Sequence, residues 1–292
     1  MLDQDVGDRL EVVLVDLGAD GAEPVEGAGD PRVRRLRAPA GTVFSEARAL
    51  GVEAAAAPLV AFVEEHARPR PGWAAALLAA AAEDEGWAAL GPAIASANPA
   101  VGFADASYLM GYALFRPEVA VRGDTRLVPG QNSCYRREAL RSLGPDLATW
   151  LSSDNVLVEG LARRGHRLTM VPGAVVEHRN EAQVRVAVAG YWAYHRIYGH
   201  RRSRLLGWSP ARRLAYVVLS PLVPLYFLAL ALGRTRRQPC QRRVLWRHLP
   251  AILLVQSAAA LAQAIGIAGG LGTAPRRFTR VELDADRPLA AS

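Results

Sequence analysis

The chain has 292 residues, of which 51% are hydrophobic and 22% are charged, so it is long and apolar enough for a domain with a core. This composition excludes a disordered tail, and two isolated cysteines exclude a disulfide framework or a cysteine-based zinc site. The formal net charge is +7, and all 35 basic residues other than histidine are arginines, which we attribute mainly to coding bias.

The N-terminal third predicts a strand, helix, strand pattern. The opening MLDQDVGDRL is acidic and lacks an apolar core, so it is no secretory signal and the N-terminal part is expected in the cytoplasm. Residues 10–16 and 33–36 predict strands, residues 45–56 a helix capped by Ser45, and residues 59–63 a further strand. This order indicates a βαβ unit, and ligands of open α/β sheets bind beyond the carboxyl ends of such strands.

The last strand of this expected unit ends at Glu64, Glu65 and His66, just before two prolines and a tryptophan. Carboxylate and imidazole groups at the end of a buried parallel strand are suited to hold a divalent cation, which can neutralise a diphosphate. The alternative is a solvated acidic turn before a helix. These three residues alone do not decide between the two.

Further elements follow in residues 73–178. An alanine-rich helix is expected at 73–82 and a strand at 89–94, whereas residues 102–128 predict an irregular stretch. Helices are expected at 136–143 and 154–164, the second closed by Gly165. Residues 168–176 predict a strand that is interrupted by Pro172 and Gly173 and ends at Glu177 and His178.

The charge changes after Glu181. Residues 182–281 hold 16 arginines and no acid, whereas the rest of the chain holds 19 arginines and 28 acids. Tyr191, His195 and Tyr198 predict a helix with an aromatic face. Two uncharged runs follow, residues 214–233 and 249–275, each long enough to cross a hydrocarbon core.

Arginines flank both uncharged runs, so a two-span hairpin would place the most basic loop outside the cell, against the usual charge asymmetry. A shallow or re-entrant hairpin bent at Pro221 and Pro224 avoids this conflict and would bind anionic lipid, with Trp192, Trp208 and Trp246 as interfacial anchors. Two buried helices of a soluble domain are the alternative, which the missing acids disfavour. A nucleic-acid binder is disfavoured because the arginines alternate with uncharged runs.

Six segments, in this order, resemble the family 2 glycosyltransferases, which have a nucleotide-sugar-binding fold of the GT-A type. The segments are LEVVLVDLGADG, EARALG, PLVAFVEEHARPRPGW, LVPGQNSCYRREAL, SSDNVLVEGLARRGH and VPGAVVEHRN, within residues 10–201. The resemblance implies an α/β fold, with a GT-A type sheet and flanking helices in residues 1–200. An arginine-rich, membrane-associated helical hairpin in residues 201–292 would follow it.

The resemblance implies roles for six residues: Asp154 as the catalytic base, Asp16 and Arg48 at the nucleotide, and Glu64, His66 and His178 at a Mn²⁺ or Mg²⁺ ion. Two alternatives stay open, since Asp154 also suits a helix N-cap and His178 a structural position at the end of a strand. Each is a common fate for its residue type.

The implied reaction is an inverting transfer of a sugar from a nucleotide diphosphate donor to an acceptor hydroxyl, with Asp154 taking the proton. The basic hairpin predicts action at the cytoplasmic face of the cell membrane, on a lipid-linked or cell-envelope glycan. Two departures favour a non-catalytic membrane scaffold or binding subunit as the alternative. Glu64-Glu65-His66 replaces the usual Asp-x-Asp motif, and the family's first strand has no counterpart before residue 10. A further departure is Ser153, which stands where an acid precedes the base in the family.

Overall fold

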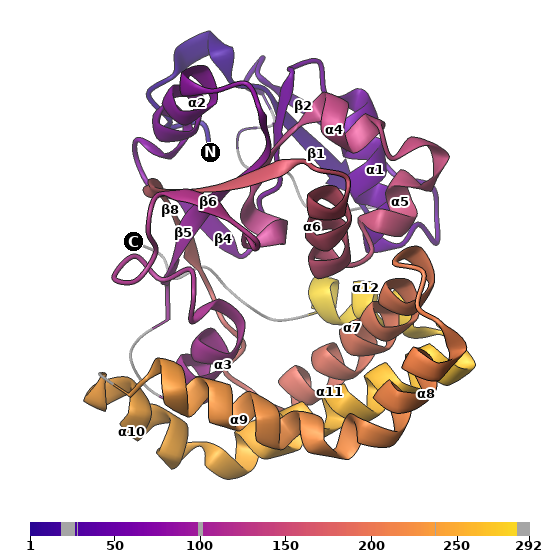
Figure 1. The fold of residues 1–292 in the computed structure, drawn as a ribbon. Helices are drawn as coiled ribbons and strands as arrows, with labels where there is room; N and C mark the ends of the chain where they lie inside the picture. Colours follow the sequence, from indigo (N-terminus) through magenta and orange to yellow (C-terminus); the bar gives the residue numbers. More distant parts are fainter. Residues whose placement is uncertain (19–26, 28, 99–101, 237, 285–292) are drawn as a thin grey trace. The chain divides into compact units, whose positions relative to one another are not determined.

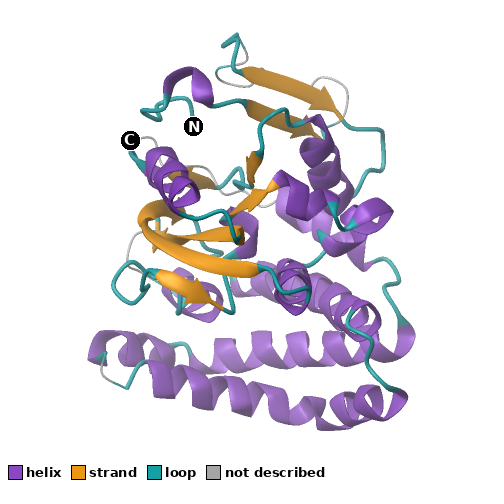
Figure 2. Cartoon of the chain, turned by 45° about the horizontal axis from the view of Figure 1, so that its top comes forward, coloured by secondary structure: helices purple, strands orange, loops and turns teal. Residues whose placement is uncertain are grey.

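The computed structural model describes residues 1–18, 27, 29–98, 102–236 and 238–284. The protein is α/β, with a mixed sheet flanked by helices and two long apolar helices near the C-terminus (Figures 1 and 2). The chain divides into two compact units, one formed by residues 1–95 and 117–177 and the other by residues 96–116 and 178–292. The predicted division near residue 200 stays a prediction.

The first unit opens with a two-stranded parallel sheet of β1 (Val12–Asp16) and β2 (Val33–Arg37), which confirms both predicted strands. Helix α1 (Phe44–Ala54) packs against β1. The helix begins after Val43 rather than at the predicted cap Ser45. The reason is local: the Glu46 carboxylate accepts a hydrogen bond from the Val43 N–H at 3.0 Å and satisfies a donor at the helix start.

The main sheet has the strand order β3-β7-β5-β8-β4, and β6 pairs with β8. The strands are β3 (Leu59–Ala61), β4 (Ala67–Pro69), β5 (Trp87–Ser96), β6 (Gly123–Thr125), β7 (Cys134–Arg136) and β8 (Arg167–His178). The expected parallel βαβ unit is wrong. Strand β3 pairs antiparallel with β7, a three-residue strand hidden in the sequence by the helix that follows it. Glu64 therefore follows an edge strand of a mixed sheet.

Strand β8 is continuous through Pro172 and Gly173, so the predicted interruption is wrong. Its neighbours β5 and β4 pair along it, and β6 pairs near its start, which outweighs the one donor that proline lacks. The predicted strand at 89–94 is confirmed as β5, whose residues are almost all buried. Strands β5 and β8 thus form the centre of the sheet.

Besides α1, the first unit contains three helices that the sequence predicts: α2 (Trp73–Glu83), α6 (Asp154–Arg163) and α4 (Arg137–Arg141), which is shorter than the predicted 136–143. The predicted stop after α6 is confirmed, because Gly165 has φ +83°. The other helical segments are short: η1 (Gly7–Arg9), η2 (Gly130–Asn132), η3 (Gly144–Asp146) and α5 (Leu147–Trp150).

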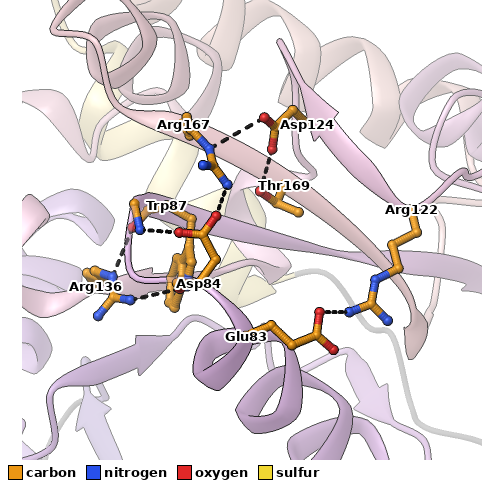
Figure 3. Close-up of polar contacts among 9 residues, drawn as sticks. Glu83, Asp84, Trp87, Arg122, Asp124, Arg136, Arg167 and Thr169 are labelled. Carbon is orange, nitrogen blue, oxygen red and sulfur yellow. Dashed lines mark hydrogen bonds and ion pairs between the residues drawn. The ribbon is translucent and has the colours of Figure 1, made fainter.

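Polar contacts tie the strand ends to the chain after α2 (Figure 3). Arg167 at the start of β8 pairs with Asp84 and, at 3.4 Å, with Asp124 of β6. Arg136 donates to the carbonyl oxygen of Trp87 at 3.0 Å and lies 4.4 Å from the centre of its ring. The Arg167 ion pairs are exposed, so each contributes little to stability, and we assign them a structural role.

The second unit is helical. Its elements are α3 (Phe103–Tyr112), α7 (Val184–Leu205), α8 (Pro210–Leu219), η4 (Ser220–Leu222), α9 (Val223–Arg234), α10 (Pro239–Arg247), α11 (Leu249–Gly269) and α12 (Ala274–Asp284). Helix α3 corrects the prediction of an irregular stretch over residues 102–128. Its buried Phe103 and Leu109 pack in a cluster with Leu245 and Ile252, which lie far away in the sequence.

The C-terminal helices correct one predicted membrane anchor. Gly270, with φ +81°, ends α11 inside the uncharged run 249–275. Trp208 is buried, with the guanidinium groups of Arg202 and Arg212 lying 5.1 and 4.4 Å from its ring. It therefore cannot anchor at a membrane interface, whereas Trp246 on α10 is 54% exposed. A 3-10 turn, η4 (Ser220–Leu222), separates α8 from α9 at Pro221, and the predicted bend there stays a prediction.

The predicted aromatic helix is confirmed as α7. The ring of His195 stacks 5.5 Å from Tyr191 and makes edge contacts with Tyr194 and Tyr198. Burial lowers the pKa of His195 to about 4, so the imidazole is neutral at pH 7. This histidine is a packing residue of the second unit.

Candidate active site

Asp154 is the first residue of α6, and its carboxylate is held by Arg48. Its Oδ1 accepts a hydrogen bond from Arg48 Nη1 at 2.7 Å, and the two side chains are 14% and 9% exposed. Ser153, not Asp154, occupies the N-cap position of the helix. A capping role alone therefore does not account for Asp154, and the predicted base meets a residue predicted to bind nucleotide.

Arg48 lies on α1 and is fixed from several sides. Its Nη1 also donates to the Leu151 carbonyl oxygen at 3.1 Å, and the guanidinium lies 4.2 Å from the centre of the Phe62 ring. Burial disfavours its charge, but the carboxylates of Asp154 and Glu64 outweigh burial and raise the pKa of Arg48. Within the described residues, its buried Nη2 has no hydrogen-bond partner. A charged donor is thus left for an anionic or oxygen-rich ligand.

Opposing influences set the pKa of Asp154. Burial raises it, the positive charge of Arg48 opposes that rise, and the negative charge of Glu64 adds to it. The balance leaves the pKa of Asp154 above that of an ordinary aspartate. Such a carboxylate is a better proton acceptor than an exposed one, as a general base requires.

Glu64 is positioned by Asn132. Its Oε2 accepts a hydrogen bond from Asn132 Nδ2 at 3.0 Å, and Asn132 is fully buried in η2. Among the residues the structure describes, Asn132 Oδ1 makes no hydrogen bond. A buried amide oxygen without a donor is costly unless a ligand or water supplies one.

Gly130 allows η2 to lie against the start of α6. A Cβ atom at Gly130 would overlap the Cβ of Asp154, so the close approach needs glycine. Tyr135, fully buried on β7, donates its hydroxyl to the Gly130 carbonyl oxygen at 2.9 Å. The turn that carries Asn132 is therefore fixed beside the predicted base.

Glu65 orients the buried imidazole of His66. His66 Nδ1 lies 3.3 Å from Glu65 Oε1, and Nε2 lies 3.7 Å from Glu64 Oε2. A carboxylate on one nitrogen of a metal-binding imidazole fixes the orientation of the ring, and two ligands of one ion lie roughly 3–3.5 Å apart. Carboxylate and imidazole suit a divalent cation in donor type, and the metal role of Glu64 and His66 stays a prediction.

His178, the third predicted ligand, is the last residue of β8 and belongs to the second unit. Its ring packs 4.7 Å from Tyr112, and its Nδ1 lies 3.1 Å from Asn180 Oδ1. Both contacts suit the structural role that the sequence left open. The predicted metal role of His178 stays a prediction.

Asp16 ends β1, as predicted. Its Oδ1 accepts from the Gly18 N–H at 2.8 Å, and its Oδ2 accepts from Arg35 Nε at 3.0 Å. The Gly18 hydrogen bond, followed by that of Arg35, holds the pKa of Asp16 below its usual value. It is an oriented anion at the carboxyl end of a strand, and its contact with a nucleoside stays a prediction.

The sequence did not single out Asn132, Phe62 or Gly130, which hold the predicted residues in place. Two of them, Gly130 and Asn132, lie in the segment VPGQNS. Asn132 is buried, and a buried polar side chain is unusual without a hydrogen-bond partner. The contact between residues 48 and 154 joins positions far apart in the chain. Only the fold reveals it.

No family model matches the chain, and a search of curated proteins found no relative. The resemblance of residues 10–201 to the family 2 glycosyltransferases therefore stays a prediction. The chemistry of the candidate site follows from its own groups: a carboxylate with raised pKa, a charged guanidinium, and an acid beside an imidazole.

Proposed function

We propose that the chain is an inverting glycosyltransferase with a GT-A type sheet that moves a sugar from a nucleotide diphosphate donor to an acceptor hydroxyl. The observation that carries this proposal is the largely buried pair of Arg48 and Asp154, next to a Glu64 held by Asn132. We further propose that the reaction takes place at the cytoplasmic face of a membrane, on a lipid-linked or cell-envelope glycan. The mixed sheet with flanking helices is compatible with this activity.

Asp154 acts as the general base in this proposal. It takes the proton of the acceptor hydroxyl while that oxygen attacks the anomeric carbon opposite the leaving group. The new bond joins the acceptor oxygen to the anomeric carbon, and the bond to the diphosphate oxygen breaks. The electron pair leaves with the nucleoside diphosphate, so the configuration at the anomeric carbon inverts.

The other groups position the reactants and their charges. Arg48 orients the Asp154 carboxylate, and its second nitrogen offers a donor to the donor sugar or diphosphate. Glu64 and His66 would hold a Mn²⁺ or Mg²⁺ ion, which neutralises charge developing on the diphosphate when bound. Asn132 and Glu65 keep these two ligands oriented.

One observation favours a binding or scaffold subunit as the second candidate. The Asp154 carboxylate is engaged by a guanidinium at 2.7 Å, and an ion-paired carboxylate is a weaker base than an unpaired buried one. Such a protein would bind a nucleotide sugar without turning it over. Loss of catalysis with retained donor binding therefore separates the two candidates.

The test is turnover by the purified full-length chain. Nucleoside diphosphate release is measured across the common sugar donors with Mn²⁺ or Mg²⁺, for wild type, Asp154→Asn and the matched control Asp146→Asn on exposed η3. We expect Asp154→Asn to lose roughly a hundredfold or more in rate while it still binds donor, because it lacks the base. Asp146→Asn should match wild type. Equal background rates for all three proteins across the donors would leave the binding subunit as the better account.

A further inference from the structure

The helical segment Pro210–Arg234, formed by α8, η4 and α9, has a long exposed apolar face. Its large exposed side chains are between 54% and 66% exposed and follow one another at spacings of one, three or four residues: Leu214, Val218, Leu219, Leu222, Leu225 and Tyr226. A helix on the surface of a water-soluble protein shows the reverse pattern, with its polar face outward. A contiguous apolar face of this length marks a surface that meets a membrane or another protein.

The opposite side of this segment packs on α11. The two helices differ in burial. In the most apolar stretch of Pro210–Arg234, 6% of the residues are buried, whereas 56% are buried in that of Leu249–Gly269. Helix α11 is thus the core helix of the second unit, and α8 and α9 cover it from one side (Figure 1).

Helix α7 packs on α11 as well. The two backbones approach so closely that a Cβ atom at Gly266 would overlap the carbonyl oxygen of Arg196, and one at Gly199 would overlap that of Gln263. Helix α7 carries arginines at positions 185, 196, 201, 202 and 204, which hydrocarbon does not accommodate. A bilayer that surrounded α11 would have to surround this basic helix too, which disfavours a transmembrane position for the bundle.

Charge identifies the partner. Residues 182–281 carry 16 arginines and no acid, and arginines stand at both ends of the exposed segment, at 212 and 213 and at 234 and 236. Two copies of this face would bring like charges together, which disfavours a dimer. The phosphates of an anionic leaflet supply the complementary charge, and its acyl chains supply the apolar phase.

We propose that Pro210–Arg234 lies in the plane of an anionic membrane leaflet and does not cross the bilayer. Its apolar face enters the acyl-chain boundary, and the flanking arginines meet the lipid phosphates. The 3-10 turn η4 joins α8 to α9, so the segment is helical over its whole length. This inference rests on the second unit alone and is independent of the proposed transfer reaction.

Vesicle flotation tests the surface. Full-length protein is diluted from mild detergent into phosphatidylcholine vesicles with or without phosphatidylglycerol, as wild type, Val218→Glu and the control Val121→Glu. Val218 and Val121 are 65% and 79% exposed, but Val121 lies in the first unit. We expect Val218→Glu to weaken binding to the anionic vesicles about tenfold and Val121→Glu to leave it unchanged.

Two results would overturn this docking surface. Equal flotation of Val218→Glu and wild type would remove the apolar face from the contact. A stable dimer that Val218→Glu dissociates, without any vesicle binding by wild type, would assign the face to a second copy of the chain.

Thiol labelling separates lying in the membrane from crossing it. Cys240 is exposed on α10, between the two apolar helices, whereas Cys134 is buried. A Val121→Cys variant adds a reporter in the first unit. A membrane-impermeant maleimide, applied to sealed inverted membrane vesicles and to intact spheroplasts, should label both exposed thiols from the same side. Labelling from opposite sides would mean that Pro210–Arg234 crosses the bilayer and would overturn the proposal.

Discussion

Two opposing influences set the pKa of Asp154. Burial in low-polarity surroundings raises the pKa, and the Arg48 guanidinium lowers it. In an enzyme that uses Asp154 as a base, the rate falls as pH drops through this pKa, because protonation removes the base. In such an enzyme, Arg48 would set the acidic limit of activity as well as the orientation of the carboxylate.

Arg48→Gln should move that limit to higher pH. Without the positive charge, the carboxylate is harder to ionise, so the pKa of Asp154 rises further and the acidic limb of kcat/KM follows it upward. Arg141→Gln is the matched control, since Arg141 is 55% exposed and pairs with Glu53. A limb that keeps its position in Arg48→Gln would argue that another group titrates.

Asn132 is expected to govern metal affinity through Glu64. Asn132→Ala removes the hydrogen bond that orients the Glu64 carboxylate, and lost support of this kind costs roughly tenfold or more in metal affinity. Titration calorimetry with Mn²⁺ alone measures the effect without any turnover. An unchanged affinity, in a variant with the wild-type unfolding temperature, would remove Glu64 from the cation site.

At the scale of elements, the η2 turn and helix α6 meet through Gly130 and Asp154. Gly130→Ala should destabilise the protein by about 1–3 kcal/mol, because the added methyl group overlaps the Asp154 side chain and the turn must shift. Gly111→Ala in α3 is the control, since its Cβ meets open space and alanine favours a helix. Thermal unfolding measures both. Similar unfolding temperatures for the two variants would contradict the close approach.

The elements that the sequence predicted are those with strong local patterns. Strand β1 is a β-branched run before glycines, α6 ends at a glycine in the left-handed region, and α7 repeats its aromatic residues at helical spacing. Strands β6 and β7 were not predicted because three residues carry no periodicity. Helix α3 was not predicted because its buried face packs against helices that are distant in the sequence.

The candidate site was predictable in its residue types but not in its contacts. Acids and imidazoles after strands pointed to Glu64 and His66, because side chains at strand ends reach ligands. The pairing of Arg48 with Asp154 spans 106 positions and depends on how α1 meets α6, which no local pattern encodes. The support from Asn132 was missed for the same reason.

At the scale of the whole molecule, charge is divided along the chain. Residues 182–281 carry a net charge of 16 − 0 = +16, and the remainder carries 19 − 28 = −9, with histidines neutral. An anionic surface attracts residues 182–281 and repels the remainder of the chain. Orientation on a membrane then follows from charge, while the depth of binding follows from the apolar face of Pro210–Arg234.

Salt should separate these two contributions. Raising the ionic strength from about 0.01 M to about 0.15 M shortens the screening length from roughly 30 Å to roughly 8 Å, so the attraction of the arginines weakens while apolar burial persists. Wild type should therefore lose part of its binding to phosphatidylglycerol vesicles at high salt, while a fraction of the binding persists. Val218→Glu should bind at low salt and lose nearly all binding at high salt, because only the arginines still hold it. Wild-type binding that ignores salt would mean that the arginines do not reach the lipid phosphates.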